Sequence, residues 1–237
     1  MDEIKIGGDT ICCLVVLDYR VKVLIPQSEV WAEEASAKNS KVLRRFLGAE
    51  VDYIIVDIDR EGNCAVASRK LALQYRRKMF SKKPPAIGDL VDCRVLAVGM
   101  ARLLLECGGY EVNLSQNSIS YGTILDLRED YKAGQNVKAV FKGLEGAHLH
   151  LSIKEVNPHP FDDVQTRHPL HSRRVSRIVG KYAGGVFCEL EKGFTCMCLY
   201  SPGQQDSGFD LGDGVIIVVT KYDYANKLVY GRIVTNW

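Results

Sequence analysis

The chain has 237 residues, of which 46% are apolar and 25% are charged, and its formal net charge at pH 7 is +2. This composition excludes a disordered or collagen-like chain and is typical of a globular protein. No apolar stretch is long enough to span a bilayer, and the opening residues MDEIKIGG lack the apolar core of a secretory signal. We therefore expect a cytoplasmic protein without a membrane partner.

Alternating apolar residues predict short β-strands along the whole chain. In chain order, the predicted strands cover residues 10–18, 19–25, 51–59, 90–98, 101–107, 136–141, 147–153, 185–191, 194–200, 214–220 and 227–234. Helix is predicted at two places. Residues 28–47 have a helix-forming composition, and residues 68–80 have the composition of a short basic helix.

One sequence pattern occurs three times, at residues 48–70, 134–154 and 212–233. Each copy begins with a glycine, has a valine three residues later, and continues with two alternating apolar runs around a charged turn. The copies recur at intervals of about eighty residues, which predicts three small domains of about five strands each.

Proline-containing segments mark the boundaries between these domains. They are KKPP at residues 82–85 and NPHP at residues 157–160, where proline interrupts helices and strand ladders. We predict domains at residues 1–81, 85–160 and 168–237. The expected fold is mostly β, with three tandem five-stranded barrels joined by short helical linkers.

The eight cysteines and the HLH segment at residues 148–150 are the residues that could bind a metal. No Cys-x-x-Cys pair is present, and the cysteines lie mainly within apolar strand-like runs. Two histidines on one strand face lack a third ligand. We therefore predict reduced cysteines and no metal site.

The repeats resemble a known family. The segment GDLVDCRVLAV in the second repeat, YAGGVFCEL in the third, and the endings SRK and SIK, the latter followed by NPHPF, resemble the RNA-binding repeat of bacterial ribosomal protein S1. The resemblance covers nearly the whole chain and implies three OB-fold barrels. Members of this family bind single-stranded RNA through two aromatics, a histidine, and an aspartate and arginine near the last hairpin.

The third repeat matches these family positions best. The resemblance assigns the aromatic, acidic and basic places to Tyr182, Phe187, Asp223 and Lys227. The histidine place falls on Leu199, or on Tyr200 if the register slips by one residue. The resemblance therefore implies that the third barrel binds RNA bases.

The first two repeats depart from the family pattern. In the second repeat, Met100 and either Arg102 or Leu103 stand at the aromatic places, and His148 stands at the basic place. The first repeat keeps Asp59 but has no aromatic. It also lacks most of its opening strand, because only MDEIKI precedes its first hairpin.

Positive charge is concentrated where the predicted barrels join. Residues 62–88 and residues 164–188 contain no acidic residue. The candidate RNA-binding cations in these tracts are Arg76, Arg77, Lys78, Arg174, Arg177 and Lys181. A single-strand binder needs aromatics for stacking and cations along the phosphate chain, and the sequence supplies both.

These observations predict a monomeric single-stranded RNA-binding protein that holds mRNA in connection with translation or the small ribosomal subunit. The alternative is a docking module, associated with the ribosome or with RNA degradation, whose first two repeats bind a protein partner. We expect no catalytic residues and no cofactor, because the repeats occupy the chain and no phosphate-binding GxxxxGK[ST] motif is present.

Overall fold

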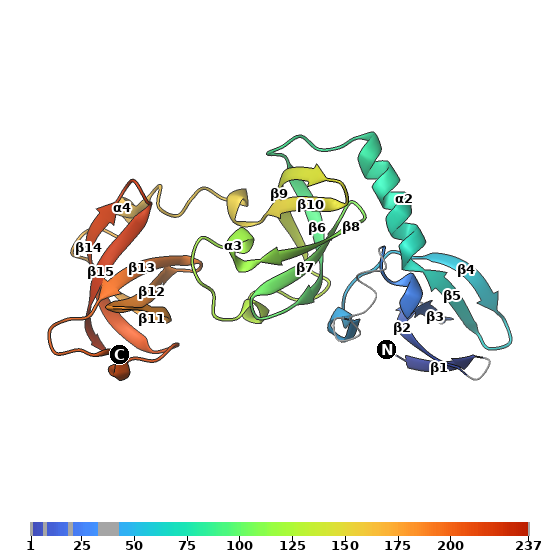
Figure 1. The fold of residues 1–237 in the computed structure, drawn as a ribbon, viewed down its shortest axis with the longest axis horizontal. Helices are drawn as coiled ribbons and strands as arrows, with labels where there is room; N and C mark the ends of the chain where they lie inside the picture. The colour runs from blue at the N-terminus through green and yellow to red at the C-terminus, as the bar shows by residue number, and fades with distance from the viewer. Residues whose placement is uncertain (1, 7–8, 19–20, 33–42, 237) are drawn as a thin grey trace. The chain divides into compact units, whose positions relative to one another are not determined.

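The computed structural model of the chain describes residues 2–6, 9–18, 21–32 and 43–236. β-strands predominate (Figure 1), which confirms the predicted mostly β class. The chain divides into two compact units. The first comprises residues 1–114 and 127–152, and the second comprises residues 115–126 and 153–237. Each of the three predicted domain ranges contains one five-stranded sheet of the described residues.

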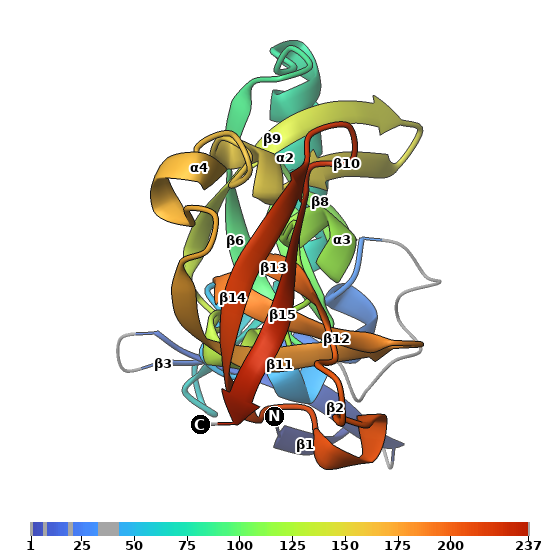
Figure 2. The same cartoon turned by 90° about the vertical axis from the view of Figure 1, so that its left-hand side faces the viewer.

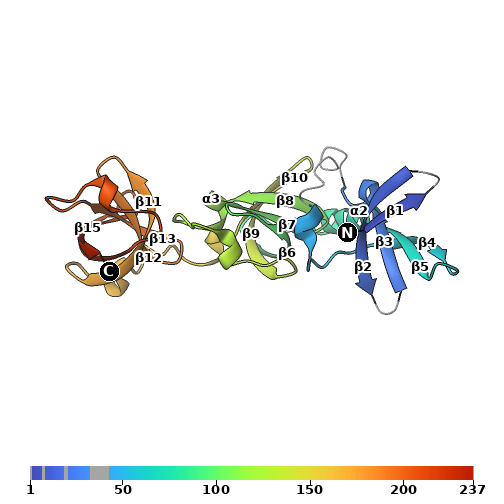
Figure 3. The ribbon, with the colours of Figure 1, turned by 90° about the horizontal axis from the view of Figure 1, so that it is seen from below.

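The first sheet belongs to the first unit and is seen in Figure 3 around the N-terminus. Its strands are β1 (Asp2–Ile6), β2 (Asp9–Asp18), β3 (Val21–Pro26), β4 (Ile54–Asp59) and β5 (Cys64–Ser68). Their spatial order is β1-β2-β3-β5-β4. β3 and β5 are parallel, and the other neighbouring pairs are antiparallel.

The second sheet also belongs to the first unit. Its strands are β6 (Leu90–Val98), β7 (Arg102–Cys107), β8 (Tyr110–Ser115), β9 (Asn136–Glu145) and β10 (His148–Ser152). Their spatial order is β10-β9-β6-β7-β8. If the strands are followed around in a circle, their order is the same as in the first repeat. The break between the first and the last strand of the sheet falls at a different place.

The third sheet belongs to the second unit and closes into a barrel (Figure 2). Its strands are β11 (Arg173–Tyr182), β12 (Gly185–Glu191), β13 (Phe194–Leu199), β14 (Gly214–Asp223) and β15 (Leu228–Asn236). Their order is β11-β12-β13-β15-β14, and β14 pairs with β11. A five-stranded closed barrel is therefore confirmed for the third repeat. That all three repeats are OB-fold barrels stays a prediction.

Helices are few and short, apart from α2 (Arg69–Lys82). The others are α3 (Gln116–Ile119), α4 (Val164–Arg167) and the 3-10 helices η1 (Gln27–Glu29), η3 (Arg44–Phe46), η4 (Leu127–Glu129), η5 (Lys154–Val156) and η6 (Asp206–Gly208). The Ser68 hydroxyl caps α2 by accepting from the Leu71 N–H at 3.1 Å. The predicted basic helix is thus present. Within the predicted helix 28–47, residues 33–42 lie outside the described residues, and the described ends are short 3-10 turns.

The repeated stretch has the same backbone geometry in all three copies. The leading glycines Gly48, Gly134 and Gly212 have φ angles of +84°, +84° and +96°, a left-handed conformation that favours glycine. The strands that follow end at Asp59, Glu145 and Asp223. In each repeat the hairpin also carries a β-bulge at an equivalent place.

The opening strand distinguishes the first repeat from the other two. In the second repeat, Leu90–Arg94 pairs with β9 and Arg94–Val98 pairs with β7. In the third, Arg173–Arg177 pairs with β14 and Arg177–Tyr182 pairs with β12. β1 has only the half that pairs with β2. The first sheet is therefore open between β1 and β4 within the described residues.

A loop of the second repeat contacts the third barrel inside the second unit. The Ser120 hydroxyl donates to the Gly193 carbonyl at 3.2 Å. The Tyr121 ring lies 4.1 Å from the His159 ring, centroid to centroid. Residues 115–126 thus belong to the second unit, although the residues on both sides of them in the chain belong to the first.

Candidate nucleic-acid interface

Strand pairing in the third barrel aligns four side chains across its outer surface. Phe187 on β12 pairs with Met197 on β13, and Met197 pairs with Tyr230 on β15. Tyr230 in turn pairs with Lys221 on β14. We call these four residues the stacking row. Neighbouring strands lie about 4.8 Å apart, so the row extends across the barrel for roughly 14 Å.

The stacking row lies outside the apolar core of its barrel. Phe187, Met197 and Tyr230 are half-buried, Lys221 is exposed, and none of them belongs to the core cluster formed by residues such as Ile217. The Lys221 ammonium lies 6.0 Å from the centroid of the Tyr230 ring. The row therefore offers apolar and aromatic surface with a cation at one end.

Tyr182 extends this surface at the end of β11. Its ring lies 5.1 Å from that of Phe187, with 49° between the planes, and its hydroxyl donates to the Cys198 carbonyl at 3.3 Å. The Tyr182 ring covers Gly185, where an added Cβ would lie 2.6 Å from the Tyr182 oxygen. The structure thus brings the two predicted aromatics together and leaves both half-buried.

Tyr200 and Lys181 lie in a second cluster around Asp206. The Tyr200 ring stacks on Phe209 at 5.4 Å, and its hydroxyl donates to Asp206 Oδ1 at 2.7 Å. Burial and this hydrogen bond raise the pKa of Tyr200 to about 12. Lys181 Nζ donates to the Asp206 carbonyl at 3.1 Å. Both predicted residues therefore have partners within the barrel.

Asp223 and Lys227 lie on the β14–β15 hairpin. Asp223 Oδ1 accepts from the backbone N–H groups of Ala225 and Asn226, both at 3.1 Å, so the carboxylate organises the turn. The Asn226 side chain also donates to this carboxylate. That hydrogen bond, together with the backbone bonds, holds the pKa of Asp223 below its usual value. Lys227 has a left-handed φ of +53° and donates to Asp162 at 2.9 Å.

The two predicted arginines on β11, Arg174 and Arg177, have different surroundings. Arg174 is half-buried and donates to the Arg167 carbonyl at 2.6 Å. Arg177 is exposed, pairs in the sheet with Glu189 and donates to the Gly212 carbonyl at 3.2 Å. Arg177 is the more accessible of the two to a ligand.

The second repeat does not present equivalent stacking residues. Met100 and Arg102 are exposed, whereas Leu103 is fully buried. His148 is exposed at the start of β10, opposite Glu145. The predicted site residues of this repeat are therefore dispersed, and none of them joins an aromatic.

Strand pairing locates the second-repeat positions that correspond to the aromatics. Ala97 pairs with Leu104 immediately after the bulge of β6, as Gly180 pairs with Phe187 after the bulge of β11. Leu104 therefore stands in the place of Phe187. Counting two residues on from Ala97 and Gly180 puts Gly99 in the place of Tyr182.

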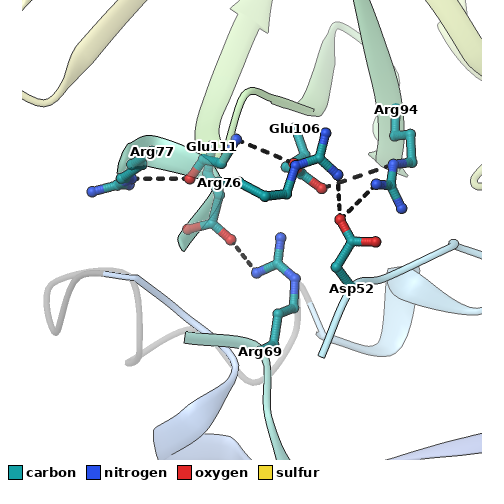
Figure 4. Close-up of polar contacts among 8 residues, drawn as sticks. Asp52, Arg69, Arg76, Arg77, Arg94, Glu106 and Glu111 are labelled. Atoms are coloured by element: carbon teal, nitrogen blue, oxygen red, sulfur yellow. Dashed lines mark hydrogen bonds and ion pairs between the residues drawn. The ribbon is translucent and has the colours of Figure 1, made fainter. Parts of the chain in front are cut away.

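The junction residues Arg76 and Arg77 contact protein groups (Figure 4). Arg76 forms ion pairs with Asp52 and Glu106. Arg77 donates to the Gly109 carbonyl at 2.9 Å and lies over the Tyr110 ring. Lys78 is exposed on α2.

Two neighbouring groups of ion pairs, one around Arg76 and one between Arg69 and Glu111, form what we call the junction cluster (Figure 4). It contains three arginines and three carboxylates: Arg69, Arg76, Arg94, Asp52, Glu106 and Glu111. Arg94 Nη2 contacts Asp52 Oδ2 at 2.6 Å. Burial raises the pKa of Asp52, but the hydrogen bonds and charges of the two arginines outweigh it and hold the pKa below its usual value. The arginine charges here are balanced.

Three members of the stacking row were not predicted from the sequence. Met197, Tyr230 and Lys221 lie on three different strands, and Lys221 follows a bulge that changes which face its strand presents. Alternation within one strand shows which side a residue faces. It does not show which residues of other strands lie beside it.

Metal sites and membrane-spanning helices each need a specific arrangement of side chains. All eight cysteines are free. Among the described residues, no group of three or more histidine, cysteine or acidic side chains could hold a metal ion. In the same part of the chain, no helix combines the length and the hydrophobicity that a bilayer crossing requires.

Comparisons with known proteins reveal distant similarities. No protein-family model matches the chain. It is 26% identical over 183 residues to 4-hydroxy-3-methylbut-2-enyl diphosphate reductase of Clostridium tetani, covering 73% of this chain and 28% of the reductase. It is 25% identical over 157 residues to small ribosomal subunit protein bS1 of Staphylococcus aureus, covering 62% of this chain and 39% of that protein.

A solved structure is also similar in part. It is a multidomain protein with nucleic acid binding domains from Streptococcus pneumoniae, with a TM-score of 0.25 and 10% identity, covering 93% of this chain and 68% of that one. The chain spans well under half the length of the curated relatives it matches.

Proposed function

We propose that this protein binds single-stranded RNA, and that the third barrel makes most of the base contacts through Tyr182 and the stacking row. The observation that carries the proposal is the row itself, with Phe187, Met197 and Tyr230 aligned outside the barrel core and Lys221 beside the last ring. Bases stack on such a surface without sequence preference, and a nearby cation attracts the phosphate chain. Similarity to protein bS1 supports RNA as the ligand.

The biological setting of this proposal is mRNA held near the small ribosomal subunit, by a monomer in the cytoplasm. We also propose that the chain acts by binding and has no catalytic activity of its own. The similar region of the Clostridium tetani reductase is only 28% of that enzyme. Purified protein is expected to leave 4-hydroxy-3-methylbut-2-enyl diphosphate unreduced, and turnover of this compound would contradict the proposal.

The double substitution Tyr182→Ala with Phe187→Ala tests the binding surface. Each stacked base is worth about 1–3 kcal/mol, so the pair should lower RNA affinity by roughly 2–5 kcal/mol. Fluorescence anisotropy with a labelled single-stranded RNA, repeated over a salt series, measures the loss. Val175→Ala is the matched control, because Val175 is exposed on β11 but lies outside the row.

Two results would contradict the proposal. Unchanged affinity of the folded double variant would exclude these aromatics as a stacking surface. Loss of the barrel fold by circular dichroism would show that they are core residues. Single-stranded DNA and duplex RNA complete the comparison, and we expect duplex RNA to bind most weakly because its bases are already stacked.

A protein-docking module is the second candidate function, and one observation favours it. β4 exposes Ile54, Ile55, Val56 and Ile58, with 41% to 60% of each residue accessible. Exposed apolar side chains on an edge strand are typical of protein contact sites. Co-sedimentation of the protein with small ribosomal subunits, which Ile58→Asp should weaken without changing RNA affinity, would distinguish this function from RNA binding.

A further inference from the structure

The first repeat does not enclose its own apolar core. Its sheet is open between β1 and β4, and Ile55 on β4 is 50% exposed. Val219, which stands before the same bulge in the third barrel, is fully buried. The five strands of the first repeat therefore bury less apolar surface than those of the third barrel, and β4 stays exposed.

Side chains of the second repeat extend the apolar core of the first. Leu96 and Ala97 of β6 are buried in the same cluster as the first-repeat residues Ile25, Trp31 and Phe46. Leu96 lies at the bulge of β6, a feature that redirects side chains. The core of the first repeat is thus continuous with one face of the second.

One position of the stacking row has its equivalent on this face of the second repeat. Leu104, in the place of Phe187, packs against the cluster that the two repeats share. A Cβ added at Gly99, in the place of Tyr182, would lie 3.2 Å from the Arg45 guanidinium of the first repeat. Of the two positions that carry aromatics in the third barrel, one therefore lies beside the shared cluster and the other beside a first-repeat side chain.

Polar and backbone contacts fix the same contact region. Asp52 of the first repeat is shared by Arg76 of α2 and Arg94 of β6 (Figure 4). The backbones also meet, since a Cβ added at Gly134 would lie 2.3 Å from the Gly48 carbonyl oxygen. This approach requires glycine at residue 134 for steric reasons as well as for its positive φ.

We propose that the second repeat completes the apolar core of the first, so that the two repeats fold as one cooperative unit, and that the positions of the second repeat that carry aromatics in the third barrel serve this shared core and do not bind RNA. The last clause rests on the proposed function. The folding clause does not, because it can be measured without RNA.

Trp31 allows a direct test in the full chain. It is 5% exposed within the shared cluster, and Trp237→Phe would make it the only tryptophan. In that background, Leu104→Glu should shift Trp31 emission to longer wavelength and lower its urea midpoint by roughly 1 M. Phe187→Glu is the matched control at the equivalent position of the third barrel, and it should leave both values unchanged.

The two glutamate variants should affect RNA affinity in the reverse order. Phe187→Glu is expected to weaken binding to a labelled single-stranded RNA at least tenfold, whereas Leu104→Glu should change it less than threefold. Unchanged Trp31 emission and midpoint in Leu104→Glu would show that the repeats fold independently and would overturn the proposal. Loss of RNA affinity in Leu104→Glu, with Trp31 unaffected, would show that the second repeat exposes its own binding face.

A second pair of variants applies if Leu104→Glu prevents folding altogether. Gly134→Ala places a methyl group against the Gly48 carbonyl, whereas Gly212→Ala has a similar positive φ but meets only the Arg177 side chain, at 3.4 Å. Backbone strain is common to both substitutions. We expect Gly134→Ala alone to lower the Trp31 midpoint, and equal midpoints for the two variants would contradict the proposal.

Discussion

The second repeat and the third barrel carry different residues on the same part of the same strand pattern. Leu104 and Phe187 occupy equivalent positions and both are half-buried, yet the leucine packs against the cluster that the first two repeats share and the phenylalanine lies in a row with Met197 and Tyr230. Repetition of a fold therefore does not repeat the side chains on a given face. The neighbours of each copy decide which faces stay available.

The charged residues show the same contrast. Arg94 pairs in the sheet with Glu106, as Arg177 pairs with Glu189. Arg94 also contacts Asp52 of the first repeat, whereas Arg177 is exposed beside the turn of its own barrel. An equivalent arginine thus serves internal packing in one repeat and stays accessible in the other.

Replacement of Arg69 should produce the largest effect, limited to the first unit. Arg69 is fully buried, and its Nη1 donates to the Val30 carbonyl at 2.7 Å and to Glu111 at 2.5 Å. Arg69→Met leaves both acceptors without this donor, which should cost about 3–5 kcal/mol. Urea unfolding followed by Trp31 emission in the Trp237→Phe background measures it, with Arg173→Met, at an exposed site, as the control.

A smaller effect is expected for Tyr230→Ala, which shortens the stacking row on its third strand. The loss of one stacked base should reduce RNA affinity by about 1–3 kcal/mol with no change in Trp31 emission. Tyr224→Ala removes an exposed tyrosine from the same hairpin but outside the row and should leave affinity unchanged. Equal losses in the two variants would show that the row does not define the ligand path.

Asp52 makes the junction cluster sensitive to acid. Its pKa in the folded protein lies below the usual 3.8, so its stabilising contribution is present above pH 4 and is lost as the pH falls through the folded pKa. The side chain is 37% exposed, so we expect only about 1 kcal/mol from Asp52→Asn at pH 7. Urea midpoints for both proteins should converge as the pH is lowered below 4; a constant difference would contradict this account.

The smallest effect is expected from Lys78→Gln. Lys78 is exposed on α2, so its substitution tests the basic tract without disturbing the junction cluster. If RNA passes this helix, affinity should fall by less than about 1 kcal/mol and the slope against log salt should decrease by about one. An unchanged slope would mean that this lysine is only solvated.

Local sequence patterns predicted most of the secondary structure because they reflect local physical requirements. Alternation located strands such as β14 and β15, and the recurring glycines located three turns with positive φ. The absence of most of the opening strand of the first repeat was also readable, since β1 has only the residues of MDEIKI. The sequence did not show how that absence affects the apolar core of the first repeat.

Contacts between distant residues could not be read in the same way. The acid-free tract around Arg76 suggested free positive charge, but the carboxylates that pair with it come from Asp52 and Glu106 in other strands and segments. Tyr230 was overlooked because its neighbours in the row belong to β13 and β14. Spatial pairing, and not composition, decides both cases.

The loop at residues 115–126 determines how this protein can be divided into fragments. The chain enters the second unit at Ser115, leaves it before Leu127 and enters it again at Ile153. No single cut in the polypeptide can therefore yield two intact halves. A fragment that ends after the second repeat would keep Ser120 but lose Gly193, its hydrogen-bond partner. Low stability or low RNA affinity of such a fragment would therefore reflect the broken second unit as much as the loss of the third barrel.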